Sequence, residues 1–255
     1  MRRPAALVVA ATLALGVGLV TAHVSASADD QAAADAAVAA FSERMIEAGG
    51  VSSGPTDITE LDAEELAEQD NFGVECFGDA VSGLEAGGRM EGETARVFSA
   101  EFTFVPPGTP VTTDWLGIDL SEHDVVTASI VTVDADHVAA IEELVDQMGS
   151  DDGAQCLMDT FAAQLSSEDT TGDSATLPGF ELEASAEFDI GVGDASAEIH
   201  FGLTSEIGEQ TYEFNTALYV ARIDRSLVFV AVVTGAESVS EIDGQAELAA
   251  VVDSL

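Results

Sequence analysis

The chain has 255 residues, enough for one large domain or two small ones and for a buried core, and its 47% hydrophobic content excludes an intrinsically disordered protein. Its charge is extreme, with 48 Asp and Glu against 7 Lys and Arg, all of them arginine, and a formal net charge of −41. Binding to nucleic acids or to anionic membrane surfaces requires a cationic patch, so this composition excludes both.

The N-terminus has the three parts of a secretory signal peptide. Arg2 and Arg3 form a cationic start, residues 5–20 are small or apolar, and the sequence ending at Ala28 is the small-x-small site of signal peptidase. We expect cleavage after Ala28, which removes both arginines and takes the net charge from −41 to −43. The alternative is an uncleaved anchor, because the apolar stretch is nearly long enough to span a bilayer. The sequence thus predicts a secreted, extracellular protein.

The acidic residues are spread along the whole chain instead of forming a tail. Most carboxylates have no cationic partner, and their mutual repulsion destabilises a compact state unless salt screens it. A dispersed acidic surface without lysine therefore predicts adaptation to high salt. The alternative is capture of a cationic partner or of a divalent metal ion.

The first half of the chain predicts helices and then strands. Residues 29–48 form an alanine-rich helix that Gly49-Gly50 ends, 51–55 read as a linker, and 57–69 form a second helix. Alternation of apolar and polar residues predicts strands at 95–105 and 125–133. Further helices are expected at 135–148 and from an Asp151 or Asp152 cap through Leu165. Residues 134–137, which include His137, are expected to provide the N-cap of the first of these, and only loosely resemble a metal-ligand cluster.

The C-terminal part has the clearest pattern. Four strands are expected, at 182–190, 195–203, 214–220 and 227–233, followed by a closing helix at 242–252. Short turns make these strands an antiparallel meander, and the last strand is apolar on both faces, which predicts a central position. The glutamates that alternate along 181–190 predict a face turned to water. The fold class is α+β, with an antiparallel sheet of about six strands and helices packed on one face.

The two cysteines, Cys76 and Cys156, are expected to form a disulfide, because an exported protein with two cysteines usually pairs them. Neither lies in a C-x-x-C motif or beside a residue that would lower a thiol pKa, so a catalytic thiol is not predicted.

No catalytic constellation stands out. His123 precedes a strand and could serve a serine hydrolase, but no G-x-S-x-G motif accompanies it, and His200 lies on the solvent face of a strand. No calcium loop, metal-ligand spacing or phosphate-binding loop is present, so we expect no cofactor and no metal. The candidate ligand contacts are Trp115, the only tryptophan, and the scarce arginines Arg222 and Arg225, which flank a tight turn at residues 223–224. The alternative for these arginines is surface ion pairing.

The arrangement resembles the exported sensor-type domains of actinobacteria, such as extracellular domains of mycobacterial serine/threonine kinases and related secreted proteins. The resemblance rests on the signal peptide, the Cys156-Leu-Met-Asp-Thr-Phe helix, the strand meander, the Arg-containing turn at 220–231 and the closing helix. A glycine is more usual in that family where Asp224 stands. The resemblance implies a helix-flanked antiparallel sheet and a ligand-sensing role.

These observations divide the chain into a signal peptide (1–28), an N-terminal helical segment (29–71) and an α+β sensor-like domain (72–255). We expect a secreted, non-enzymatic ligand-binding or sensing domain whose partner is a small molecule or a cell-envelope protein. The alternatives are an envelope-associated structural or interaction protein and a secreted hydrolase.

Overall fold

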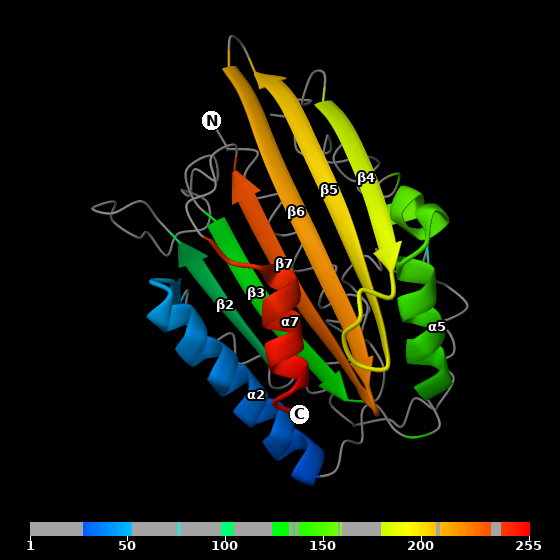
Figure 1. Cartoon of the computed structure of the whole chain (residues 1–255). Helices are drawn as coiled ribbons and strands as arrows, with labels where there is room; N and C mark the ends of the chain where they lie inside the picture. The colour runs from blue at the N-terminus through cyan, green and yellow to red at the C-terminus, as the bar shows by residue number, and fades with distance from the viewer. Residues whose placement is uncertain are drawn as a thin grey trace, which may run out of the picture.

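The computed structural model describes residues 28–52, 76, 98–104, 124–132, 135, 138–157, 159, 180–207, 210–235 and 241–255. Within them, one antiparallel sheet of seven strands has the order β1-β2-β3-β7-β6-β5-β4 (Figure 1). The strands are β1 (Val51–Ser52), β2 (Phe98–Phe104), β3 (Asp124–Thr132), β4 (Phe180–Phe188), β5 (Ala195–Ile207), β6 (Gln210–Ile223) and β7 (Ser226–Gly235). The helices are α2 (Ala28–Glu47), α5 (Val138–Met148), α7 (Gly244–Val252) and a helical segment that includes residues 151–157. The predicted α+β fold class is confirmed.

Strand β7 occupies the centre of the sheet, between β3 and β6, as its apolar pattern predicts. Its side chains point alternately into two hydrophobic cores on opposite faces of the sheet. Leu227, Phe229 and Ala231 belong to the first core, and the residues between them belong to the second. A strand that is apolar on both faces needs cover on both. The helices are accordingly divided between the two faces, and the expectation that they pack on one face is wrong in this respect.

The first core lies between the sheet and α5. Ile141, Leu144, Val145 and Met148 of this helix are buried at helical spacing against apolar residues of β5, β6 and β7. The helical residues 151–157 add Ala154 and Leu157 to this core.

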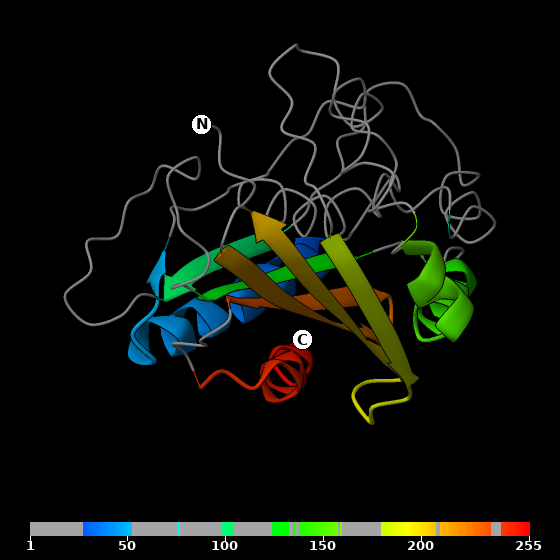
Figure 2. The same ribbon diagram turned by 90° about the horizontal axis from the view of Figure 1, so that it is seen from above.

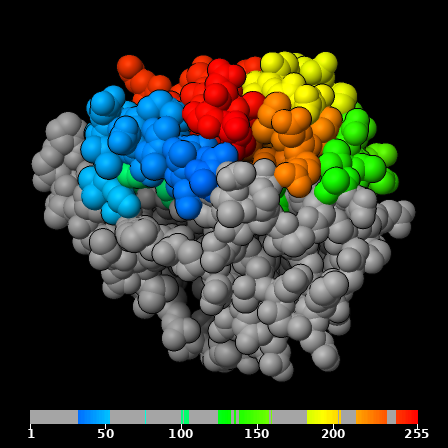
Figure 3. Space-filling model, turned by 90° about the horizontal axis from the view of Figure 1, so that it is seen from below, coloured from blue at the N-terminus to red at the C-terminus, as the bar shows by residue number. Residues whose placement is uncertain are grey.

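The second core lies under α2 and α7, on the other face of the sheet (Figure 2). Phe41 and Met45 of α2 are fully buried there, and Phe41 meets Phe102 of β2 edge to face at 5.9 Å between ring centroids. Arg44 of α2 also pairs with Glu247 of α7 at 2.9 Å. In Figure 3, α7 (red) lies between α2 (blue) and residues of β4 and β5 (yellow).

Helix α2 ends as the two glycines predict. Gly49 has φ of 94°, and the amide of Gly50 donates to the Met45 carbonyl at 2.8 Å. The chain then pairs Val51 with Thr103 of β2, so residues 51–52 form a short edge strand where a linker was expected. This strand brings the sheet to seven members.

Several predictions fall outside the described residues. They include residues 1–27 of the signal peptide, the helix at 57–69, the domain boundary at residues 71–72, and the capping segment around His137. Ala28 is the first residue of α2, and the predicted cleavage after it stays a prediction. In the part of the chain that is described, no helix combines the length and apolarity needed to cross a membrane.

Candidate functional site

The predicted site residues lie in different places. Trp115 and His123 are outside the described residues, so the predicted ligand contact at Trp115 stays a prediction. Arg222 is near the end of β6, and Arg225 lies in the turn itself, because the two-residue turn is Asp224-Arg225 and not residues 223–224.

The side chain of Arg222 is engaged within the fold. Its Nη1 donates to Asp194 Oδ2 and to the Asp224 carbonyl, both at 3.1 Å, and only 12% of the side chain is exposed. Asp194 Oδ2 also accepts from the Asp224 amide at 2.9 Å. Arg222 therefore ties the β4–β5 turn to the β6–β7 turn, which supports the structural alternative for this arginine.

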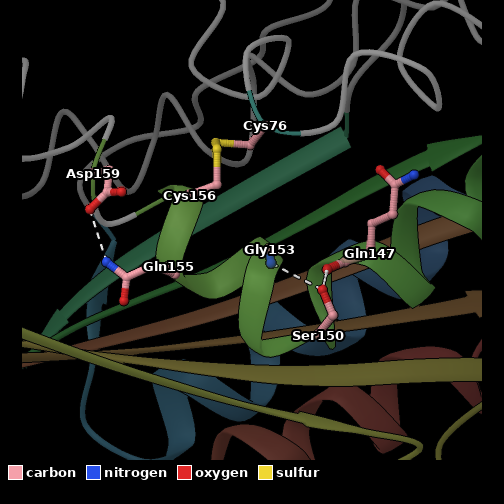
Figure 4. The surroundings of a disulfide bond; sticks show 7 residues. All are labelled: Cys76, Gln147, Ser150, Gly153, Gln155, Cys156 and Asp159. Carbon is pink, nitrogen blue, oxygen red and sulfur yellow. Dashed lines mark hydrogen bonds between the residues drawn. A yellow bond between two sulfur atoms is a disulfide. The ribbon is translucent and has the colours of Figure 1, made fainter.

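The predicted disulfide between Cys76 and Cys156 is present, with a Cα–Cα distance of 5.5 Å (Figure 4). Cys156 lies in the helical segment that follows α5, so the bond attaches Cys76 to the first core. The cap of this helix differs from the prediction. Ser150 Oγ accepts from the Gly153 amide at 3.0 Å, so the cap is Ser150 and not Asp151 or Asp152.

The side of the sheet that carries α7 is only partly covered by it. Helix α7 packs against β6 and β7, and Figure 1 shows no helix in front of β4 and β5. We use the name open face for the exposed and half-buried polar residues of β4 and β5 on this side, together with two adjoining residues of β6. They are Glu183, Ser185, Glu187, Glu198 and His200, with Asn215 and Tyr219 of β6. The predicted water-facing side of β4 is confirmed, since Glu183 and Glu187 are exposed.

Strand register brings three of these residues together around one carboxylate. Glu198 and His200 are two residues apart on β5, on the same face, and Tyr219 of β6 is the cross-strand partner of Glu198. Glu198 Oε1 pairs with His200 Nε2 and the Glu198 side chain also accepts a hydrogen bond from Tyr219. The His200 and Tyr219 rings meet edge to face at 6.4 Å.

The electrostatics of this group follow from its partial burial. Burial raises the pKa of Tyr219 to about 12, helped by the charge and hydrogen bond of Glu198 and by the charge of Asp243. Tyr219 is therefore a neutral hydrogen-bond donor at ordinary pH. The Glu198 side chain is 15% exposed and that of His200 is 52% exposed, so a ligand can reach the histidine while the carboxylate lies beneath it.

Gly244, the first residue of α7, fixes Tyr219 from above. A Cβ at this position would lie 2.2 Å from Tyr219 Cε2, so only glycine lets the helix sit this close to the ring. Asp243 caps the helix by accepting from the Ala246 amide at 3.1 Å. The N-terminal end of α7 thus forms the boundary of the open face.

The geometry of the open face bears on two kinds of catalytic site, a serine nucleophile with its histidine and a metal centre. Ser185 is the cross-strand partner of His200, so serine, histidine and glutamate are neighbours here. However, β5 pairs with β4 on one side and β6 on the other, so the backbone amides of β5 beside His200 are occupied and cannot form an oxyanion hole. In the described part of the chain, no group of three or more His, Cys, Asp or Glu side chains is placed to hold a metal ion.

Sequence reasoning placed His200 correctly on a solvent-exposed face but missed its partners. Their convergence depends on the pairing register of β4, β5 and β6, and the turns between these strands were the signal for it. Comparisons with family models, with curated proteins and with solved structures found no match to this chain.

Proposed function

We propose that this chain is a secreted, salt-adapted, non-enzymatic ligand-binding or sensing domain, and that it binds a small cationic ligand on the open face. The observation that carries the proposal is the position of Glu198, a largely buried carboxylate held between His200 and Tyr219. Glu183 and Glu187 extend the negative charge across the same face. An ammonium or guanidinium group would meet several carboxylates there.

Secretion is supported by two independent features. The N-terminal sequence has the pattern of a signal peptide. The Cys76–Cys156 disulfide is a bond of the type that persists in oxidising compartments.

Salt adaptation is supported by the composition, since 48 acidic residues face 7 basic ones. Screening of their repulsion makes stability rise with salt. The melting temperature should increase steadily from 0.1 M to 3 M NaCl and far less with an equally concentrated uncharged osmolyte. An equal response to both solutes would reject the electrostatic explanation.

The binding proposal is tested with the secreted protein in native mass spectrometry and with a ligand panel. A co-purified ligand would appear as excess mass, and small organic amines, neutral analogues and carboxylates would then be compared at constant ionic strength. We expect cationic compounds alone to shift the His200 resonances in NMR spectra. Glu198→Gln should weaken this binding at least tenfold, whereas Glu142→Gln, an exposed position on α5, should leave it unchanged. The proposal would be overturned if neutral or anionic compounds bound as tightly as cationic ones, or if Glu198→Gln left the affinity unchanged.

A hydrolase that uses Ser185 and His200, a different pair from the predicted candidate His123, has its own test at the same site. A fluorophosphonate probe reacts with activated serines, and the proposal of a non-enzymatic domain expects no labelling of Ser185. Labelling at Ser185 that His200→Ala abolishes would favour the hydrolase instead.

A further inference from the structure

We propose that β4 binds an extended segment of a partner protein in which basic and apolar residues alternate, by adding that segment to the sheet as a further strand. This proposal is separate from the small-ligand function, because it uses the edge of the sheet. Strand β4 is the last strand on its side and pairs with β5 over all nine of its residues. Among the described residues, no strand pairs with its other edge.

The two edges of the sheet differ in how they are protected. At the opposite edge, β1 is only two residues long. Strand β4 has nine residues, contains no proline and no basic residue, and pairs with β5 without a bulge. Short length, proline, lysine and bulges are among the devices that prevent edge pairing, and β4 lacks these four; its charged residues are all glutamates, which oppose an acidic partner and favour a basic one. Its outward amides and carbonyls are therefore suited to pair with a further strand.

The two faces of β4 define the side chains that the partner must carry. On the α7 side, Glu183 and Glu187 are exposed. On the α5 side, Ala184 and Ala186 are half-buried at the margin of the first core. A neighbouring strand would place basic residues opposite the glutamates and apolar residues beside the alanines. The chemistry of the edge thus specifies a strict alternation.

Phe188 supplies an apolar contact at the end of this edge. Its side chain lies against Gly149, where a Cβ would be 2.9 Å from Phe188 Cδ2, yet 49% of the residue is exposed. An apolar residue of the added strand can cover the exposed part of the ring.

Charge decides between a basic segment and a second copy of this chain. Pairing β4 with β4 of another copy would bring the glutamate rows of both copies side by side, and like charges in neighbouring positions oppose pairing. The net charge of −41 adds repulsion over the whole surface. A basic segment meets neither obstacle.

The experiment uses the full-length secreted protein and three eight-residue peptides. One alternates lysine and valine, the second has the same composition with four lysines followed by four valines, and the third alternates glutamate and valine. Binding is measured at 0.15 M and 1 M NaCl, and hydrogen–deuterium exchange locates the bound peptide. We expect the alternating lysine peptide to bind at least tenfold more tightly than the other two and to slow exchange in residues 180–188. Its affinity should fall at least tenfold at 1 M NaCl.

A charge-swap variant tests the edge directly. Glu183→Lys with Glu187→Lys should weaken binding of the lysine peptide at least tenfold and create binding of the glutamate peptide. The matched control, Glu142→Lys with Asp146→Lys, changes the net charge equally on exposed positions of α5 and should alter affinity less than threefold. Thermal melting of each variant checks that it is folded.

Three outcomes would overturn the proposal. One is slow exchange of every β4 amide before any peptide is added, which would mean that the edge is already covered. Another is equal affinity for the alternating and the block lysine peptides. The third is a salt-induced dimer with protection at residues 180–188, which would make a second copy the occupant. The His200 resonances report small-ligand binding separately, so either proposal can fail while the other stands.

Discussion

Asp194 and Arg222 are joined twice, once through the backbone and once through their side chains. The Asp194 amide donates to the Arg222 carbonyl at 2.7 Å, and Arg222 Nη1 donates to Asp194 Oδ2 at 3.1 Å. Gly193 makes this approach possible, because a Cβ there would lie 2.4 Å from the Arg222 carbonyl oxygen. In a chain with so few cations, this arginine is used to lock two turns together.

Asp194→Ala should destabilise the protein by about 1 kcal/mol, because the variant loses the ion pair and leaves the Asp224 amide without this acceptor. The expected loss of stability is small because 43% of the Asp194 side chain is exposed, so water screens the ion pair. Asp194→Asn keeps an oxygen that can accept from the Asp224 amide and should lose less. Chemical denaturation at fixed salt measures both. Equal stability of the wild type and Asp194→Ala would show that the turns hold together without this carboxylate.

Removing the Glu198 charge should lower the pKa of Tyr219 from about 12 while leaving it above 10. Glu198 contributes to the raised pKa through its charge and its hydrogen bond, but burial is the larger cause and persists in Glu198→Gln. Tyrosinate absorbance would be followed against pH in a Tyr212→Phe background, where Tyr219 is the only tyrosine. Glu187→Gln is the control, because Glu187 is an exposed acid of the same face. An equal shift in both variants would point to the general negative field instead of the direct contact.

The raised pKa of Tyr219 also predicts how stability changes at alkaline pH. Between the unfolded pKa of 10 and the folded pKa of about 12, the unfolded chain releases the tyrosine proton while the folded chain keeps it. Stability is thus fully present below pH 10 and falls as the pH rises through this interval. Tyr219→Phe, measured by denaturation at pH 9 and pH 11, should show a smaller loss than the wild type.

Much of the fold could be predicted because single segments carry enough information. The two-sided apolar pattern of β7 places it at the centre, and the faultless alternation of β4 and β5 gives their buried faces. Asp224 has a positive φ of 50°, a conformation that suits the tight turn between β6 and β7.

The features that could not be predicted from the sequence are of two kinds. Some depend on contacts between distant segments, and others on which of several adjacent residues with the same chemistry caps a helix. The cap at Ser150 was assigned to the adjacent aspartates, which have the same capping chemistry. The strand at Val51 forms because β2 offers it an edge, which its own residues do not reveal. The group around Glu198 requires the register of three strands at once.

Opening the disulfide should cost about 4 to 5 kcal/mol, because the bond closes a loop of 80 residues in the unfolded chain. The variant Cys76→Ser with Cys156→Ser and the wild type with reductant should show the same loss in denaturation at high salt. Matching values separate the effect of the cross-link from that of the substitutions. A loss below about 1 kcal/mol in both would mean that the unfolded chain gains little freedom when the bond opens.

Gly244→Ala should destabilise the protein by about 1 to 3 kcal/mol, because the added Cβ would overlap the Tyr219 ring and push α7 away from β6. Gly202→Ala on β5 is the matched control. Its Cβ would meet only Asn215 Oδ1, at 3.7 Å, and alanine suits a strand better than glycine, so stability should be unchanged or rise by up to about 1 kcal/mol. Denaturation gives both values, and the Tyr219 titration gives a second readout that a general loss of stability would not move. If α7 moves outward, Tyr219 becomes more exposed and its pKa falls toward 10, whereas an unchanged pKa in a destabilised Gly244→Ala would contradict the close packing of this helix on the ring.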